Sequence, residues 1–314
     1  MIELEHAIIK TLAWFDIFNH PMTEWEIFKF LYAPNLDPKK CDFIKVKSCL
    51  QNPSPWLQTH IEKHDARYTL PDKKWLIQRH ERQHIRFRKK WQRAKIMAKQ
   101  ISMIPFLKTF AMCNVFTLQD SNSLSDMDVF IIAQKNRIWI VRSLTTALTF
   151  ILKKWRHKKY VSNRFCLSFF ITNEELDLKS IIQKPYDIYL IYWIALLAPL
   201  YGKQEAEKFF TSNTWISKYL PNWYHRDESD KYTTNSTFFK KTIKHLFQVI
   251  LNGKLGNLTE HLAKYLQLRH MSHHTTNPKS SIIISDTMLK FHNEDRRKNF
   301  RSTWERKVKA ILNK

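Results

Sequence analysis

Residues 129–133, Val-Phe-Ile-Ile-Ala, form an apolar run with no polar residue on either face. Successive side chains of a strand point to opposite faces, so a run of this kind is buried on both sides. Strands with this pattern lie inside sheets that helices cover. We therefore expect residues 129–133 to form a central strand of a sheet flanked by helices.

Two acidic residues, Asp126 and Asp128, stand at the start of this strand. In an extended chain their side chains leave the same face, roughly 6–7 Å apart. Paired carboxylates at this spacing suit one or two Mg²⁺ ions, which can clamp a triphosphate and an attacking oxygen. The alternative is that Ser125 and Asp126 only turn the chain into the strand by bonding their own backbone.

The surrounding sequence resembles the nucleotidyltransferase family of the DNA polymerase β type. The resemblance rests on Ile104-Pro105-Phe106, on Phe110-Ala111-Met112-Cys113-Asn114 and on Ser125-Asp126-Met127-Asp128, and it extends to Trp139-Ile140-Val141-Arg142. It implies a mixed sheet with flanking helices and transfer of a nucleoside monophosphate from a nucleoside triphosphate to an acceptor.

The resemblance also implies roles for individual residues. Asp126 and Asp128 would be the catalytic Mg²⁺ ligands, and Asn114 and Ser125 would lie near the triphosphate. Arg142 would contact a substrate phosphate, although a structural arginine at the start of a helix fits the sequence equally well.

The sequence departs from the family pattern at two places. Val115 follows Asn114 where the family has Gly-Ser, and a valine side chain donates no hydrogen bond. The neighbouring strand expected at residues 164–171 contains no acid, although Glu174, Glu175 and Asp177 follow it. The general base and one metal ligand are therefore unassigned. The alternative function is a catalytically decayed fold that acts as a nucleic-acid-binding or adaptor protein.

Charge favours polyanionic partners. Lys plus Arg exceed Asp plus Glu by 52 − 28, a net charge of +24. Nucleotides, nucleic acids and acidic surfaces are all attracted by such a charge, which a drift toward lysine without any binding function would also give.

Glycine and cysteine usage exclude several other sites. The three glycines form no glycine-rich loop, so a P-loop and a dinucleotide-binding turn are both excluded. The four cysteines show no C-x-x-C spacing and are expected to be reduced core thiols of a cytoplasmic protein. The amino terminus does not resemble a signal peptide, and the apolar stretch 188–201 is too short to span a bilayer, so no membrane partner is expected.

Residues 1–72 are typical of a winged helix-turn-helix. Leu4, Ile8, Leu12 and Phe15 mark a first helix, and Thr23 with Glu26 forms a capping box for a second, stapled by Met22 and Ile27. A third helix is expected over 38–50, followed by a hairpin of strands 57–61 and 66–70. The lysines of the third helix would contact nucleic-acid phosphates, or residues 1–72 would only pack against the rest of the chain.

A long basic helix is expected over residues 73–103. Phe87, Trp91, Ala94, Ala98 and Ile101 form one stripe, and eleven Lys and Arg residues lie between 73 and 99. The cations Arg79, Arg82, Arg86, Lys89, Lys90 and Arg93 form either a ridge that binds nucleic-acid phosphates or a solvated face.

The whole chain is thus predicted to be α+β. Residues 104–182 would form the nucleotidyltransferase-like core with its mixed sheet, and residues 183–314 a helical C-terminal region. His270, His273 and His274 approach metal-ligand spacing, but no acid or cysteine accompanies them.

Overall fold

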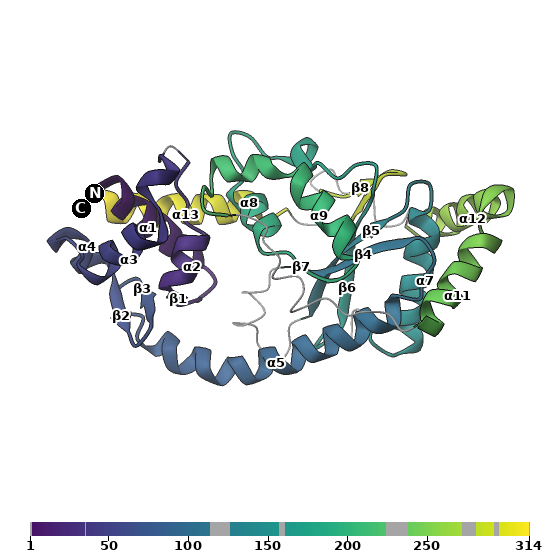
Figure 1. Cartoon of the computed structure of the whole chain (residues 1–314), viewed down its shortest axis with the longest axis horizontal. Coiled ribbons are helices and arrows are strands. Elements are labelled where there is room, and N and C mark those ends of the chain that lie inside the picture. Colours follow the sequence, from purple (N-terminus) through teal and green to yellow (C-terminus); the bar gives the residue numbers. More distant parts are fainter. Residues whose placement is uncertain are drawn as a thin grey trace.

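The computed structural model describes residues 2–34, 36–113, 126–156, 161–223, 238–271, 281–291 and 295–313, with Glu81 described by its backbone alone. The chain is an α+β protein, as predicted. It has an N-terminal unit with a small sheet, a long connecting helix and a larger mixed sheet covered by helices (Figure 1).

The N-terminal unit combines four α-helices with a three-stranded antiparallel sheet of order β1-β3-β2. Its elements are α1 (Ile2–Asp16), β1 (Met22–Thr23), α2 (Glu24–Lys29), η1 (Pro38–Lys40), α3 (Phe43–Gln51), α4 (Pro55–His60), β2 (Glu62–His64) and β3 (Arg67–Thr69).

The predicted capping box at the start of α2 is confirmed. The Thr23 amide donates to Glu26 Oε2 at 2.8 Å, and the Glu26 amide donates to Thr23 Oγ1 at 3.2 Å. Met22 and Ile27, the predicted staple pair, are both fully buried. Local sequence therefore determines where this helix begins.

Two local predictions in this unit are wrong. Residues 57–60, expected in a strand, belong to helix α4, because Ser54 Oγ accepts the Leu57 amide at 3.1 Å and Pro55 occupies the first helical turn. The hairpin is consequently shorter, and Asp65 makes its turn with a φ of 54°. The third helix is divided into η1 and α3, because Asp42 caps a new helix start by accepting the Lys45 amide at 2.9 Å.

The long helix α5 (Trp75–Ile101) joins the N-terminal unit to the larger sheet and runs along one side of the molecule (Figure 1). Ala94, Ala98 and Ile101 are buried and pack on the sheet, as the stripe predicted, whereas Phe87 and Trp91 are half-buried. Lys90 was expected on the basic ridge but is only 3% exposed, because it lies on the side of the helix that faces the interior.

The larger sheet has the strand order β7-β4-β5-β6-β9-β8. Its strands are β4 (Leu107–Met112), β5 (Met127–Ala133), β6 (Phe165–Thr172), β7 (Ala198–Tyr201), β8 (Ile283–Ile284) and β9 (Met288–Lys290). β5 and β6 are parallel and are connected through α7 (Ile138–Ile151), whereas the other neighbours are antiparallel. Residues 129–133 are buried in β5 as predicted.

The C-terminal region is not wholly helical, because β7, β8 and β9 complete the larger sheet. Pro199, near the end of the apolar stretch 188–201, lies in β7 at the sheet edge, where a missing amide hydrogen is tolerated. The other elements are η2 (Leu178–Ile181), α8 (Ile188–Ala195), α9 (Lys203–Ser212), η3 (Thr214–Lys218), α11 (Phe238–Ile250), α12 (Gly253–Met271) and α13 (Arg297–Leu312).

One hydrophobic core joins the N-terminal unit to the larger sheet. Trp14 of α1 stacks on Tyr192 of α8 with ring centroids 5.2 Å apart. α13 packs on α1, where Trp304 Nε1 donates to the Lys10 carbonyl at 2.8 Å and Lys307 pairs with Asp16 at 2.7 Å. Over the described ranges, no helix is long and apolar enough to cross a bilayer.

Candidate functional site

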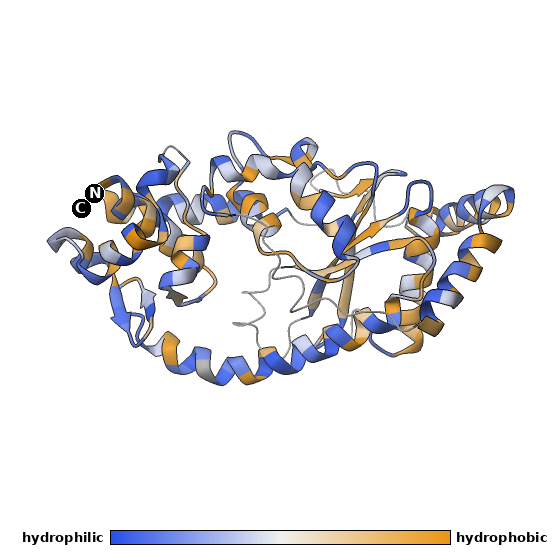
Figure 2. Cartoon of the chain, viewed as in Figure 1, coloured by the Kyte–Doolittle hydropathy of each residue, from blue (hydrophilic) through white to orange (hydrophobic). Residues whose placement is uncertain are grey.

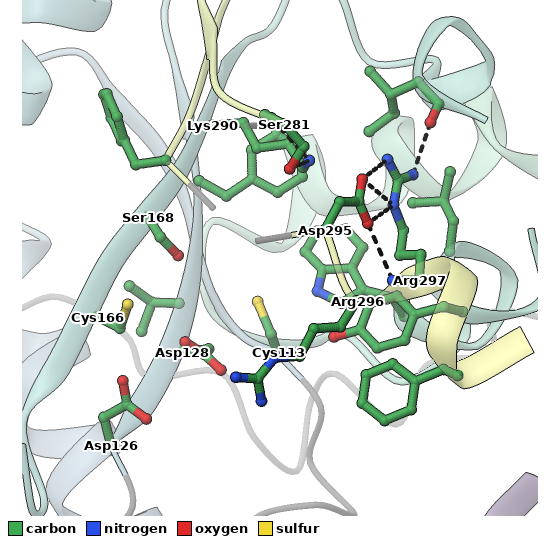
Figure 3. A pocket seen from close by; sticks show the side chains of 18 of the residues that line it. Cys113, Asp126, Asp128, Cys166, Ser168, Ser281, Lys290, Asp295, Arg296 and Arg297 are labelled. Carbon is green, nitrogen blue, oxygen red and sulfur yellow. Dashed lines mark hydrogen bonds and ion pairs between the residues drawn. The ribbon is translucent and has the colours of Figure 1, made fainter. Parts of the chain in front are cut away.

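A cavity of about 660 Å³ opens at the start of β5 and β6 (Figure 3). One wall comes from the sheet, through β5, β6 and β9, and the other from η2, α8 and the start of α13. The polar residues that line it include Cys113, Asp126, Asp128, Arg156, Cys166, Ser168, Lys290, Asp295, Arg296 and Arg297. The cavity thus combines carboxylates and thiols with several cations.

Asp126 and Asp128 both line this cavity, as the alternation of strand side chains requires. Cys166 on β6 is the strand neighbour of Asp128. One oxygen of each carboxylate and the Cys166 sulfur all lie within 4.8 Å of one another. The three side chains could therefore hold one metal ion together.

Two cations, Arg156 and Lys90, interact with Asp126. Arg156 Nη1 lies 2.8 Å from Asp126 Oδ2 and donates to Cys166 Sγ at 3.2 Å. A bridge between Trp155 and Phe165 pairs this segment with β6 and so positions the guanidinium. Burial lowers the pKa of Lys90, and the charge of Asp126 opposes that change, so α5 brings a second cation within electrostatic reach of Asp126.

The three donors differ in protonation. Burial, followed by the charge of Asp126, raises the pKa of Asp128 to about 6. Burial, followed by the charge of Asp128, raises the pKa of the Cys166 thiol to about 12. At neutral pH without a metal, Asp128 is mostly ionised with a small protonated fraction, and Cys166 is a neutral thiol.

Several cations line the cavity beyond the two aspartates. Lys290 donates to Ser281 Oγ at 3.0 Å, and burial lowers its pKa to about 8, which keeps much of its charge at neutral pH. Arg296 extends across the cavity toward Asp128 and Cys113 (Figure 3). Arg297 pairs with Asp187 at 2.7 Å and with Asp295 at 2.6 Å, so its charge is balanced within the wall.

The remaining predicted residues have different positions. Asn114 and Ser125 lie outside the described residues. Arg142 does not line this cavity; its guanidinium donates to Gln267 and lies 4.6 Å from the centre of the Phe291 ring. Burial also lowers the pKa of Arg142, to about 10. These contacts fit the alternative interpretation of Arg142 as a structural arginine.

The acids after β6 do not reach the cavity. Glu174 pairs with Lys135 at 2.5 Å, Glu175 bonds Thr287, and Asp177 caps η2 by accepting the Lys179 amide at 3.0 Å. The position on β6 beside Asp128 is instead a cysteine. Arg156, Cys166, Lys290 and Arg296 were not predicted as site residues, because only folding brings these distant parts of the chain together.

The donor set fits Mg²⁺ in part. The two carboxylates are the oxygen ligands that Mg²⁺ prefers, whereas a thiol suits Zn²⁺ and other softer ions. Asp295, the other carboxylate of the described cavity lining, is engaged by Arg297. Three histidines have near-ligand spacing. Among the described residues, His270 belongs to no cluster of potential metal ligands, and His273 and His274 lie outside the described residues.

No protein-family model, curated protein or solved structure matches this chain.

Proposed function

We propose that the protein is a Mg²⁺-dependent nucleotidyltransferase, which transfers a nucleoside monophosphate from a nucleoside triphosphate to a hydroxyl group. The observation that carries this proposal is the placement of Asp126 and Asp128 side by side in a cavity that several cations also line. A metal-bound triphosphate requires carboxylates for the ion and cations for the phosphate oxygens, and the cavity lining contains both.

The described residues have distinct proposed roles. Asp126 and Asp128 hold the cation, which would neutralise phosphate charge and orient the reacting groups. Lys290 of β9 and Arg296 at the start of α13 bind phosphate oxygens. Asn114 and Ser125 are proposed to contact the triphosphate because of the family resemblance alone.

The element order supports the same proposal at the level of the fold. α5, β4, β5, α7 and β6 follow in this order along the chain, and β4, β5 and β6 are adjacent strands of the mixed sheet. Asp128 lies in β5 and Asp126 just before it. We propose that residues 104–182 are a nucleotidyltransferase-like core and that the N-terminal unit is a winged helix.

Nucleotide titration tests the function directly. We expect the protein to release or absorb heat with at least one of the four ribonucleoside triphosphates in the presence of Mg²⁺, and to transfer label from its α-phosphate to an acceptor. Asp126→Asn and Asp128→Asn should abolish both signals, whereas Asp65→Asn, at the exposed hairpin turn, should retain them. Wild-type protein that gives no heat with any of the four nucleotides would overturn the proposal.

A second candidate function is nucleic-acid binding without catalysis. It is favoured by Cys166, which stands beside Asp128 where a third carboxylate would complete the site, and by the cations of α5. The exposed cations of this helix include Arg82, Arg86, Arg88, Lys89 and Arg93. This function predicts binding that weakens steeply with salt and is unchanged by Asp126→Asn, whereas an affinity that is flat with salt would contradict it.

A further inference from the structure

The hairpin of α11 and α12 carries an unusual share of exposed apolar side chains. Eleven of the twenty large apolar residues exposed among the described residues belong to these two helices. They are Phe238, Phe239, Leu246, Phe247, Val249, Ile250, Leu255, Leu258, Leu262, Tyr265 and Leu266. Monomeric soluble proteins rarely expose apolar patches of more than a few hundred Å², so a patch of this kind marks an interaction surface.

α11 turns Lys240 and Lys244 toward the protein and most of its apolar side chains outward. Lys244 donates to the Leu107 carbonyl at 2.6 Å and to the Tyr201 hydroxyl at 2.9 Å, and Lys240 donates to the Lys99 carbonyl at 2.7 Å. Phe239 and Leu246, on another side of the helix, are 71% and 56% exposed. This orientation is the reverse of an ordinary surface helix, whose apolar stripe faces the core.

α12 presents its apolar stripe outward in the same manner. Glu260 accepts the amides of Trp139 and Ile140 at 2.8 and 2.9 Å, and Gln267 donates to the Trp139 carbonyl at 3.0 Å, so this face of the helix is fixed against α7. Leu258 and Leu262, on the other face, are 68% and 55% exposed. Both helices lie at the end of the molecule far from the N-terminal unit, where orange and blue residues alternate along them (Figure 2).

Charge determines which partner fits this surface. Residues 238–271 contain one acid, Glu260, which is buried, so the exposed charges of the hairpin are cationic. They are Lys241, Lys254 and Arg269, and exposed histidines lie among them. A second copy of the chain would bring like charges together, whereas an anionic lipid surface complements them.

We propose that the outward face of α11 and α12 binds an anionic lipid bilayer, with the apolar side chains among the headgroups and the cations beside the lipid phosphates. Amphipathic helices with aromatic and leucine side chains on one face and lysines at its border bind membrane interfaces in this way. The helices lie on the bilayer and do not span it. The inference is independent of the proposed nucleotidyltransferase activity.

Flotation of the full chain with two kinds of vesicle tests this proposal. Vesicles of phosphatidylcholine alone should bind little protein, and vesicles of equimolar phosphatidylcholine and phosphatidylglycerol should bind it in a salt-sensitive manner. Leu246→Glu and Leu258→Glu should each weaken binding at least about tenfold, because each removes a buried leucine from the complex. Lys241→Glu with Lys254→Glu should weaken binding to the anionic vesicles as well.

Ile44→Glu and Ile85→Glu are matched controls, because these isoleucines are 78% and 62% exposed on α3 and α5. They should bind the anionic vesicles as the wild type does. Circular dichroism should show that every variant is folded. Equal binding to both kinds of vesicle would overturn the choice of an anionic surface. Failure to bind either kind, or a dimer that Leu246→Glu dissociates without any vesicle binding, would overturn the membrane assignment.

Discussion

The guanidinium of Arg156 lies 2.8 Å from the Asp126 carboxylate, so one of the two proposed metal ligands already has a cationic partner. A metal ion must share Asp126 with this fixed positive charge. The same arginine donates to the Cys166 sulfur. Arg156 therefore couples Asp126 to the thiol of β6 and is the residue best placed to control cation affinity.

Replacing Arg156 should strengthen cation binding. Arg156→Gln removes a positive charge beside the carboxylates, and we expect the affinity for Mn²⁺ to rise by about threefold to tenfold, with the gain shrinking as salt increases. Calorimetric titration measures the change. Arg156→Lys should bind as the wild type does, and an unchanged affinity in Arg156→Gln would show that the pairing does not oppose the ion.

Asp128 should make the fold less stable as the pH rises from about 4 to about 6. Its pKa is raised from 3.8 to about 6 in the folded chain, so the unfolded chain loses this proton at lower pH than the folded one. The resulting penalty grows over that interval, is constant above it, and amounts to at most about 3 kcal/mol.

Urea unfolding of Asp128→Asn measures this penalty. The variant should be more stable than the wild type near neutral pH, and the difference should shrink toward pH 4. Asp65→Asn should show no such pH-dependent difference. A constant difference at every pH would contradict a raised pKa for Asp128.

Cys166 should contribute a sulfur ligand when a thiophilic ion is bound. Co²⁺ added to the protein should give the near-ultraviolet charge-transfer absorption of a cobalt thiolate, because the Cys166 sulfur lies within 4.8 Å of a ligand oxygen of each aspartate. Cys166→Ser should abolish the band. Cys49→Ser, a buried cysteine of α3, should retain it; loss in both variants would point to a different thiol or to misfolding.

Glu260 should stabilise the docking of α12 on α7. Its two oxygens accept amides at the start of α7, which has no side-chain cap of its own. Glu260→Ala should lower the free energy of unfolding by about 2 kcal/mol, and Glu260→Gln by less, since an amide oxygen still accepts. Thermal or urea unfolding measures both. Glu207→Ala on the exposed face of α9 should change stability little, and equal losses in the two alanine variants would contradict the cap.

Patterns that depend on neighbouring residues predicted the structure well. The capping box at Thr23, the buried strand at residues 129–133 and the long helix at 75–101 are each specified within one element. Residues 57–60 were assigned to a strand because their alternation outweighed Ser54 and Pro55, although these two residues are a helix start signal.

Relationships between distant segments could not be predicted in the same way. Asp126 and Asp128 were predicted from sequence as a pair, but Arg156, Lys290 and Arg296 share a cavity with them only after β6 and β9 join the sheet. Lys90 is buried because it lies on the side of α5 that faces the interior. The basic residues around this helix do not indicate which side that is. The outward apolar faces of α11 and α12 likewise follow from tertiary hydrogen bonds of Lys244 and Glu260.

The packing of α13 on α1 has a consequence for synthesis. Trp304 and Lys10 are 294 positions apart, and the ring of Trp304 lies edge-on to Tyr32 at 5.1 Å. On the ribosome the N-terminal unit emerges first, and the side of Tyr32 that Trp304 covers stays exposed to water until α13 has been translated. Binding of a chaperone to nascent chains should therefore persist until residues 297–312 leave the exit tunnel.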